Sequence, residues 1–253
     1  MAIAFDTIPA DTFGTSAASI ESSAYTMAGS NRCDFAALAA GAGTPAAHNA
    51  VKRGGSGGTD YTQCGSTLNI GSFGRLSVWR LVAPSTSSLT LYGAYAASQD
   101  EIAIGASNYT GVDQTTPIGT VFTNTGTATG SSPVNMTVSV TGIASGDWVY
   151  AAFWAVDGNG NSPLMTPNGT PTPNGRYEVE GSQLTFEALQ IQDAVSTGTS
   201  ITMSCAIQPT SGSMSVDWGV IAFKIAAATG GGGVFIKPVG PNFRLAGIGG
   251  LAS

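Results

Sequence analysis

Charged residues are scarce in this sequence. Only 9% of the 253 residues are Asp, Glu, Lys or Arg, whereas about 25% is usual for soluble globular domains. The formal net charge is −6 and the nine basic residues are scattered along the chain, so the basic patch of a nucleic-acid-binding protein is missing. A surface of Ser, Thr, Asn and Gly resists association weakly, which suits a protein that functions inside an assembly. We therefore expect no nucleic-acid partner.

Histidine is almost absent, since His48 is the only one. A Ser-His-Asp or Cys-His triad thus has one possible base, and the chain has no G-x-S-x-G nucleophile elbow. A metal site with two histidine ligands is excluded. Because His48 falls in a glycine-rich stretch, we interpret it as a solvated loop residue and not as a catalytic base.

Cysteine is also rare. Cys33, Cys64 and Cys205 share no CxxC spacing, which indicates neither a zinc site nor a disulfide framework. Cys205 lies on the apolar side of the alternating stretch 201–207, so we expect it to be a small buried residue of a strand. A Cys33–Cys64 pair stays open.

Long hydrophobic runs are missing as well. The longest, 148-WVYAAFWAV-156, is too short to cross a bilayer. The first residues, 1-MAIAFDTIPAD-11, lack the basic region of a secretory signal peptide. We accordingly expect assembly in the cytoplasm and no membrane partner.

What the sequence does contain is alternation with a period of two. In 134-VNMTVSV-140 apolar and polar residues alternate as in a half-buried antiparallel strand, whereas 147-DWVYAAFWAV-156 is apolar on both faces and should lie in mid-sheet. Further strands are predicted at residues 75–82, 88–96, 101–109, 118–122, 176–180, 183–191 and 216–225. Many short strands separated by Gly and Pro turns predict an all-β fold, an antiparallel β-sandwich of jelly-roll type.

Two segments fall outside this pattern. Residues 41–60 are rich in glycine and poor in apolar side chains, so we expect a long loop. The four glycines at 230–233 predict a flexible hinge. Beyond them, the segment 234–253 is apolar but interrupted by prolines, which predicts an extended C-terminal docking arm that binds a neighbouring subunit. A disordered tail is the alternative.

The predicted organisation follows from these segments. It comprises an N-terminal segment at 1–19, a β-sandwich domain at 20–228, a Gly hinge at 229–233 and the C-terminal docking arm at 234–253. The arm residues predicted to bind the partner are Phe235, Ile236, Phe243, Leu245 and Ile248.

Acidic residues that could form the carboxylate pair of a glycosidase are few. The candidates are Asp100 with Glu101, Glu178 with Glu180, and Glu187. Glu178 and Glu180 would share one face of a strand, which we interpret as the polar outer face of a sheet edge.

The stretch 157-DGNGN-161 is a candidate calcium loop, with oxygen ligands at Asp157, Asn159 and Asn161. An EF-hand needs a Glu at the twelfth position, where this chain has Asn168. Gly-Asn turns form without metal, so we expect no catalytic residue and no cofactor.

The polar stretch 108-NYTGVDQTTPIGT-120 lies between two predicted strands. Gly111 permits a positive φ, and Asp113 with the hydroxyls of Thr115 and Thr116 can bond to nearby backbone amides. No nucleophile with a base is present, so we predict a structural connection.

Four stretches follow one another in a recognisable order: 79-WRLVAPSTSSLTLYG-93, 109-YTGVDQTTPIGT-120, 147-DWVYAAFWA-155 and 217-DWGVIAFKIA-226. Over about residues 20 to 227 the chain resembles a family of β-sandwich domains found in tailed-phage virion proteins and in uncharacterised bacterial proteins. The resemblance implies a structural role without catalysis. It does not extend to residues 41–60 or to the segment after residue 230.

We therefore expect a non-enzymatic virion structural protein of a tailed bacteriophage, most simply a capsid decoration (cement) protein. Its expected partners are the major capsid protein or other virion subunits, and we expect a homo-oligomer. Three alternatives stay open. They are a tail or fibre protein that contacts the host, a carbohydrate-binding module with exposed aromatic residues, and a glycoside hydrolase or lyase with carboxylates in a cleft. We assign the four tryptophans to the core.

Overall fold

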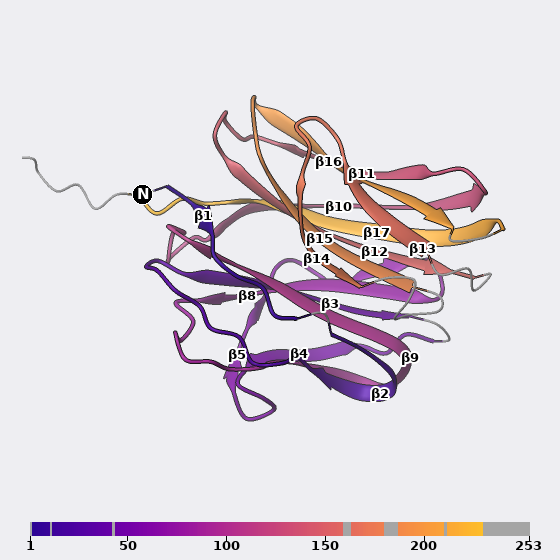
Figure 1. Ribbon diagram of the computed structural model, residues 1–253, viewed down its shortest axis with the longest axis horizontal. Coiled ribbons are helices and arrows are strands. Elements are labelled where there is room, and N and C mark those ends of the chain that lie inside the picture. Colours follow the sequence, from indigo (N-terminus) through magenta and orange to yellow (C-terminus); the bar gives the residue numbers. More distant parts are fainter. Residues whose placement is uncertain are drawn as a thin grey trace, which may run out of the picture.

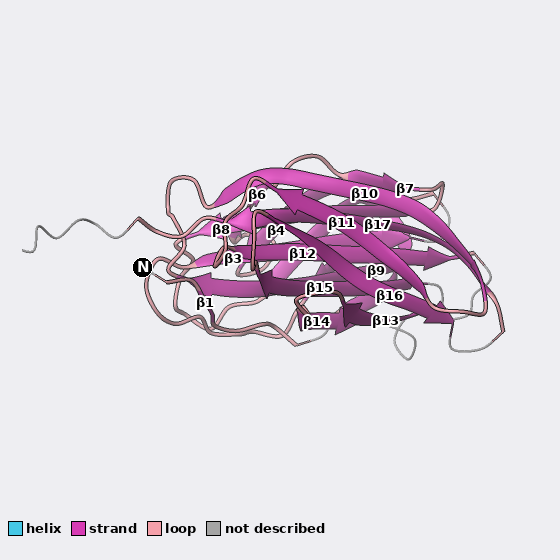
Figure 2. Cartoon of the chain, turned by 90° about the horizontal axis from the view of Figure 1, so that it is seen from above, coloured by secondary structure: helices cyan, strands magenta, loops and turns pink. Residues whose placement is uncertain are grey.

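The protein is built of antiparallel strands. The computed structural model describes residues 2–10, 12–41, 44–158, 163–179, 187–209 and 212–229. These residues form three antiparallel sheets and no helix, so the predicted all-β sandwich is confirmed. The sheets are stacked, and their strands run along the long axis of the molecule (Figures 1 and 2).

The first half of the chain forms one sheet of nine strands. Its members are β1 Ala4–Phe5, β2 Phe13–Glu21, β3 Cys33–Gly41, β4 His48–Arg53, β5 Thr59–Asp60, β6 Thr62–Gln63, β7 Leu68–Ile70, β8 Gly74–Val82 and β9 Leu91–Thr110. The second half forms a sheet of five strands and a sheet of three. Its members are β10 Ile118–Gly130, β11 Val134–Thr141, β12 Trp148–Asp157, β13 Pro163–Asn168, β14 Asn174–Val179, β15 Glu187–Val195, β16 Ser200–Pro209 and β17 Met214–Ile225.

The pairing in the second half is nested, as in a jelly roll. The first strand, β10, pairs with the last, β17. Strand β11 pairs with β16 and β12 pairs with β15. The innermost strands, β13 and β14, do not pair with each other, because β13 pairs with β16 and β14 with β15. The jelly-roll prediction therefore holds for residues 118–225.

The nine-stranded sheet bends on itself at β9. The first part of this strand pairs with β4 and β2, and its second part pairs with β3. The register with β2 shifts where Ala17 lies opposite Gln99 and Ser19 opposite Ala94. The sequence predicted two strands at 88–96 and 101–109. The polar residues between them instead form a bulge inside one continuous strand, which bends the sheet.

Three hydrophobic clusters separate four layers of strands. One cluster fills the bend of the nine-stranded sheet, one lies between that sheet and the five-stranded sheet, and one lies between the five- and three-stranded sheets. Figure 1 shows these layers, with β4 and β2 at one side and β11 and β16 at the other. Strand β12 lies between β15 and β17 and contributes Trp154 to one cluster and Phe153 to the next. The prediction that this strand is covered on both faces is confirmed.

Glycines let the two halves of the chain approach closely. The Tyr177 ring of β14 lies on Gly105 of β9, where an added Cβ would be 2.4 Å from ring atoms. The Tyr177 hydroxyl donates to the carbonyl of Ile104 at 2.6 Å and accepts from the amide of Thr12 at 2.6 Å. On the other side, Ile70 of β7 fills the space above Gly219 of β17 in the same way. The halves therefore share one interlocked core.

The prediction of a long loop at residues 41–60 is wrong. Strand β4 starts at His48 and pairs with β9, with Val51 opposite Gly93. Strand β5 returns along β4, and Gly54 and Gly55 adopt φ angles of 91° and 76° in the turn. The glycines thus form a tight hairpin turn that only residues tolerating positive φ can make.

Candidate functional site

The connection between the two halves is a tied turn. Residues 111–117 join β9 to β10, and Gly111 has a φ of 71°. The Asp113 carboxylate accepts hydrogen bonds from the amides of Thr115 and Thr116 at 2.8 and 2.9 Å. These bonds, with Thr116 contributing most, lower the pKa of Asp113 from its ordinary value. The predicted role of Asp113 in fixing the connection is confirmed, although the threonines contribute their amides to it and not their hydroxyls.

The two ends of the described chain meet at this connection. Ala4 of β1 pairs with Thr110. Ala227 forms a bridge with Val112, and the amide of Ala228 donates to the carbonyl of Gly111 at 2.8 Å. The start of the predicted hinge at residue 229 is therefore held beside the connection. The arm residues Phe235, Ile236, Phe243, Leu245 and Ile248 lie outside the described residues.

A buried carboxylate, Asp193, organises the same end of the molecule. Arg176 binds it with two hydrogen bonds, Nε to Oδ2 at 2.5 Å and Nη2 to Oδ1 at 2.9 Å. The Tyr109 hydroxyl donates to Oδ2 at 2.8 Å, and the Asn174 amide donates to Oδ1 at 2.9 Å. The Arg176 guanidinium also lies 4.0 Å from the centre of the Phe5 ring. This group ties β1 and β9 to β14 and β15, so its role is to hold the halves together.

A second buried carboxylate, Asp34, lies inside the bent sheet. The hydroxyls of Tyr25 and Tyr61 donate to its Oδ2 at 2.6 and 2.5 Å. Burial raises the pKa of Asp34 above its ordinary value, and these hydrogen bonds oppose the shift. Arg53 lies over the Tyr25 ring at 3.7 Å and donates to the Tyr25 carbonyl at 2.6 Å.

Neither group is predicted from the sequence. Their signal is a charged residue inside a strand that is otherwise buried, Asp34 in β3 and Asp193 in β15. Such a residue needs buried partners, but sequence spacing does not indicate which ones. The partners of Asp193 come from as far away as Tyr109.

The structure places three of the candidate carboxylates near one another, at the end of the molecule away from the connection. Glu187, at the start of β15, lies against Gly41, where an added Cβ would be 1.6 Å from its Oε1. Neither of its carboxylate oxygens has a hydrogen-bond partner. Burial raises the pKa of Glu187 well above its ordinary value, and the charges of Glu101 and Asp100 raise it further. Because Glu187 is 0% exposed, its carboxyl group offers no surface to a polysaccharide.

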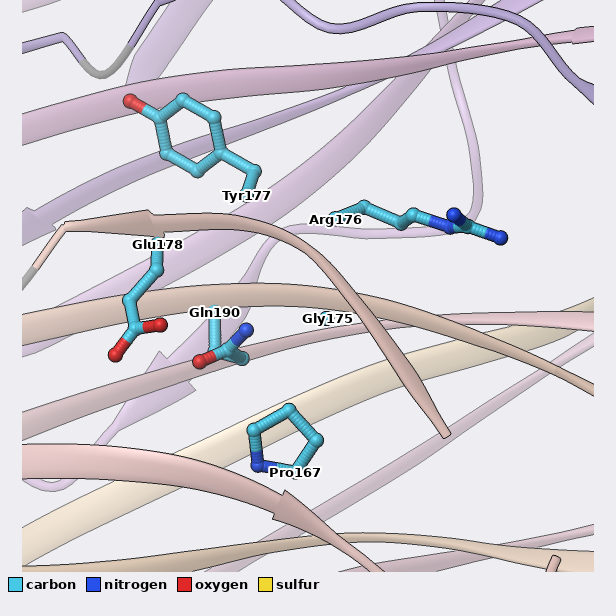
Figure 3. A pocket seen from close by; sticks show the side chains of 6 residues that line it. All are labelled: Pro167, Gly175, Arg176, Tyr177, Glu178 and Gln190. Atoms are coloured by element: carbon cyan, nitrogen blue, oxygen red, sulfur yellow. The ribbon is translucent and has the colours of Figure 1, made fainter. Parts of the chain in front are cut away.

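Glu178 lies elsewhere, in the lining of a pocket of about 220 Å³ between β13 and β14. The side chains that line it are Pro167, Gly175, Arg176, Tyr177, Glu178 and Gln190 (Figure 3). Glu180, the predicted companion of Glu178, lies outside the described residues.

His48 is not a solvated loop residue, so that interpretation is wrong. It lies in β4 with its Nδ1 2.6 Å from the Ser77 hydroxyl and its ring edge-on to Tyr95. Burial, together with the charge of Arg75, lowers its pKa to about 3. The imidazole is therefore neutral at physiological pH and held in place by packing.

The three cysteines are buried, which confirms the prediction for Cys205, and none of them forms a disulfide, so Cys33 and Cys64 do not pair with each other. Burial raises the pKa of Cys64 to about 12, so the thiol is not a ready nucleophile.

The calcium candidate is described only at Asp157, which is buried and accepts a hydrogen bond from the amide of Ser215 at 3.0 Å. Asn159 and Asn161 lie outside the described residues. Within the described ranges, no group of three or more His, Cys, Asp or Glu side chains is placed to hold a metal ion. The described ranges contain no helix that is long and apolar enough to span a membrane.

The tryptophans lie mainly in the core, as predicted. Trp79, Trp154 and Trp218 are buried, and Trp148 is half-buried against the cluster between the two halves. The large apolar side chains exposed in the described part of the chain are Phe13, Phe73 and Val195.

No protein-family model matches the chain, and no curated protein matches it. The resemblance to β-sandwich domains of phage virion proteins, with the role that it implies, thus stays a prediction.

Proposed function

We propose that the protein is a non-enzymatic structural protein of a tailed-phage virion, and that it decorates the capsid through its C-terminal arm. The observation that carries the proposal is the fixed departure point of the arm. The amide of Ala226 donates to the carbonyl of Pro117 at 2.9 Å and that of Asp113 to the carbonyl of Ala226 at 2.8 Å. The predicted arm would therefore leave the body from a defined position.

The chemistry of the body supports the same role. Its buried carboxylates bind side chains from other parts of the fold: Asp34 accepts from two tyrosines, and Asp193 accepts from Tyr109 and Arg176. Its surface carries few charges, since only 9% of all residues are charged. Contact between such a surface and other subunits requires little desolvation of charge. Burial of the arm would add about 25 cal/mol for each Å² of apolar area removed from water.

The first test compares co-purification of two forms with phage particles. The full-length protein is expected to attach to capsids, and a form ending at Gly230 is expected to stay free. The second variant keeps the full length of the arm but removes its apolar side chains, so it is also expected to stay free. In it Ser replaces Phe235, Ile236, Phe243, Leu245 and Ile248. Equal attachment of all three forms would contradict the docking-arm proposal. Attachment to tails or to host cells instead of capsids would favour a tail or fibre protein.

A further inference from the structure

Strand β10 is an edge of the five-stranded sheet. It pairs with β17 and with no other strand of the described chain, and this pairing is regular from Val121 to Gly130. Figure 2 shows β10 at one margin of the stacked sheets. The start of the strand is covered at Val121 by the loop at Gly65, where an added Cβ would lie 3.2 Å from the valine side chain. The part of the edge beyond Val121 has no neighbouring strand.

The pairing of β17 shows which backbone groups of β10 point outward. The amide of Gly158 donates to the carbonyl of Ser215 at 2.9 Å, so Ser215 forms its hydrogen bonds toward β12. Successive residues of a central antiparallel strand bond alternately to its two neighbours. Thr129 lies opposite Ser215 and therefore directs its amide and carbonyl away from β17. The other odd-numbered residues of this regular stretch do the same.

The outward positions of the open edge are all threonines. Their side chains at Thr123, Thr125, Thr127 and Thr129 are exposed. The amide of Thr125 donates to the side-chain oxygen of Asn124 at 3.0 Å, which agrees with an outward direction. The outward amides of the other three have no hydrogen-bond partner within the described residues. A strand added here would pair with these amides and replace the single bond to Asn124.

Other edge strands of the molecule carry features that discourage pairing with another chain. Strand β13 contains Pro163 and Pro167. Strand β14 contains Arg176 at a register shift, and β2 has a register shift between Ala17 and Ser19. In contrast, the 13 residues of β10 include no charged residue and no proline. Its edge is therefore suited to bind a further strand.

A second copy of β10 is complementary to this edge. Two copies related by a two-fold axis present the same surface to each other. If the axis passes through Gly126, Thr123 lies opposite Thr129 of the other copy and Thr125 lies opposite Thr127. Each such pair brings together outward amides and carbonyls, and threonine pairs stabilise antiparallel sheets. Because the strand carries no charge, the two copies place no like charges opposite each other at the contact.

We infer that two copies of this protein associate through their β10 edges, so that their five-stranded sheets form one continuous sheet. The inference concerns the body of the protein and does not depend on the proposed function. It identifies the surface that would form the homo-oligomer expected from the sequence.

Sedimentation velocity of the full-length protein tests this association. Between about 1 μM and about 1 mM we expect a change from monomer to dimer. Each copy has a net charge of −6, so raising the salt concentration from about 0.05 to about 0.5 M should strengthen the dimer by screening the repulsion. A wild-type protein that stays monomeric over the whole range, or a dimer that salt dissociates, would overturn the inference.

Two edge variants and one control locate the contact. Thr125→Glu adds a negative charge to each copy at the contact, and Thr127→Pro removes an outward amide that makes no bond to β17. Each should raise the dissociation constant at least about tenfold. Thr197→Glu adds the same charge at an exposed position in the turn between β15 and β16 and should dimerise more strongly than Thr125→Glu. Equal dimerisation of Thr125→Glu and Thr197→Glu would show that β10 is not the interface.

The folded state of the variants is checked by thermal unfolding. Both glutamate variants should melt close to the wild type, because the substituted side chains are exposed. In the isotope-labelled wild-type protein, hydrogen exchange at the amides of Thr123, Thr127 and Thr129 should slow as the protein concentration rises. Exchange that does not depend on concentration while the protein dimerises would place the interface elsewhere.

The C-terminal arm is the other segment that could cover this edge. The full-length variant with serine at the five arm positions separates the two cases. If two bodies pair through β10, this variant should dimerise as the wild type does, whether or not it attaches to capsids. If it is monomeric, the arm and not a second β10 forms the contact, and the inference is wrong. Failure to attach to capsids would by itself bear only on the proposed function.

Discussion

Asp193 and Glu187 are two buried carboxyl groups in the same strand with opposite surroundings. Both side chains are 0% exposed, and both belong to β15. Asp193 receives hydrogen bonds from Arg176, Tyr109 and Asn174. Glu187 receives none, and the nearby charges of Glu101 and Asp100 have the same sign as its own.

The contrast shows that the two ends of one strand can differ in how they contribute to stability. A buried charge with hydrogen-bonded partners fixes the layers that supply those partners. A buried carboxyl group without partners is stable only in its protonated form, because low polarity disfavours the ion. The end of β15 beside the connection is therefore held by the partners of Asp193, whereas the stability contributed by the other end depends on pH.

The largest expected effect comes from removing Arg176, because Asp193 would then be, like Glu187, a buried carboxyl group without a positively charged partner. Arg176→Leu removes both hydrogen bonds to Asp193 and the contact of the guanidinium with the Phe5 ring. Leaving one charge of a buried pair without its partner costs about 3–5 kcal/mol. We expect the free energy of unfolding, measured by urea denaturation at pH 7, to fall by about 3 kcal/mol, the lower figure because Arg176 is 18% exposed.

The double variant Arg176→Leu with Asp193→Asn is the control. It removes the charge together with its partner, so a large part of the lost stability should return. If the single and double variants unfold at the same urea concentration, the ion pair does not set the difference between the two ends of β15.

The second prediction concerns pH. The folded-state pKa of Glu187 is raised well above its ordinary value of 4.5 by burial and then by Glu101 and Asp100. The stability that this group contributes is therefore complete below about pH 4.5 and is lost as the pH rises through the folded-state pKa. Within that window the wild-type protein should lose about 1.4 kcal/mol per pH unit relative to Glu187→Gln.

Urea denaturation at pH 5, 6, 7 and 8 checks this slope. Glu187→Gln preserves the size of the side chain beside Gly41 and does not ionise, so its profile should be flatter than that of the wild type. Asp60→Asn, at an exposed ion pair, should follow the wild type. Parallel profiles for the wild type and Glu187→Gln would mean that the carboxyl group ionises without penalty.

Much of the fold was predictable because each buried strand carries its own local pattern. The alternation of 134–140 and the doubly apolar 147–156 identified β11 and β12, and their neighbours follow from the short turns between strands. The bend of β9 was not predictable, because a polar interruption can be a turn or a bulge and only pairing with distant strands decides between them. The glycines near residue 54 led to the wrong prediction of a long loop for a similar reason, since they are compatible with both a loop and a hairpin turn.

The candidate sites were harder to predict because their partners are distant in sequence. Asp113 bonds to amides two and three residues away, so its role follows from the local sequence. Asp193 depends on Tyr109, and Glu187 on Gly41 and Glu101. These residues are far apart in the sequence and meet because sheets stack on one another. The local periodicity of the sequence does not indicate how the sheets stack. The Glu178 pocket is a case of the same kind, because it forms between strands that do not pair.

The smallest expected effect is at Asp113, an exposed carboxylate that completes the comparison. Like Asp193 it receives hydrogen bonds, but from backbone amides in contact with water. These bonds lower its pKa below the ordinary value of 3.8, so its stabilising contribution is present above about pH 3.8 and is lost as the pH falls through the folded-state pKa. Asp113→Ala should lower the melting temperature at pH 7 by less than Arg176→Leu does, and the difference from the wild type should vanish in strong acid.

The same variant should leave particle attachment unchanged. The connection also positions Ala226 through the backbone amide of residue 113, and alanine retains that amide. A variant that folds normally but no longer attaches would show that Asp113 contacts the partner directly, and the connection would then be part of the binding surface.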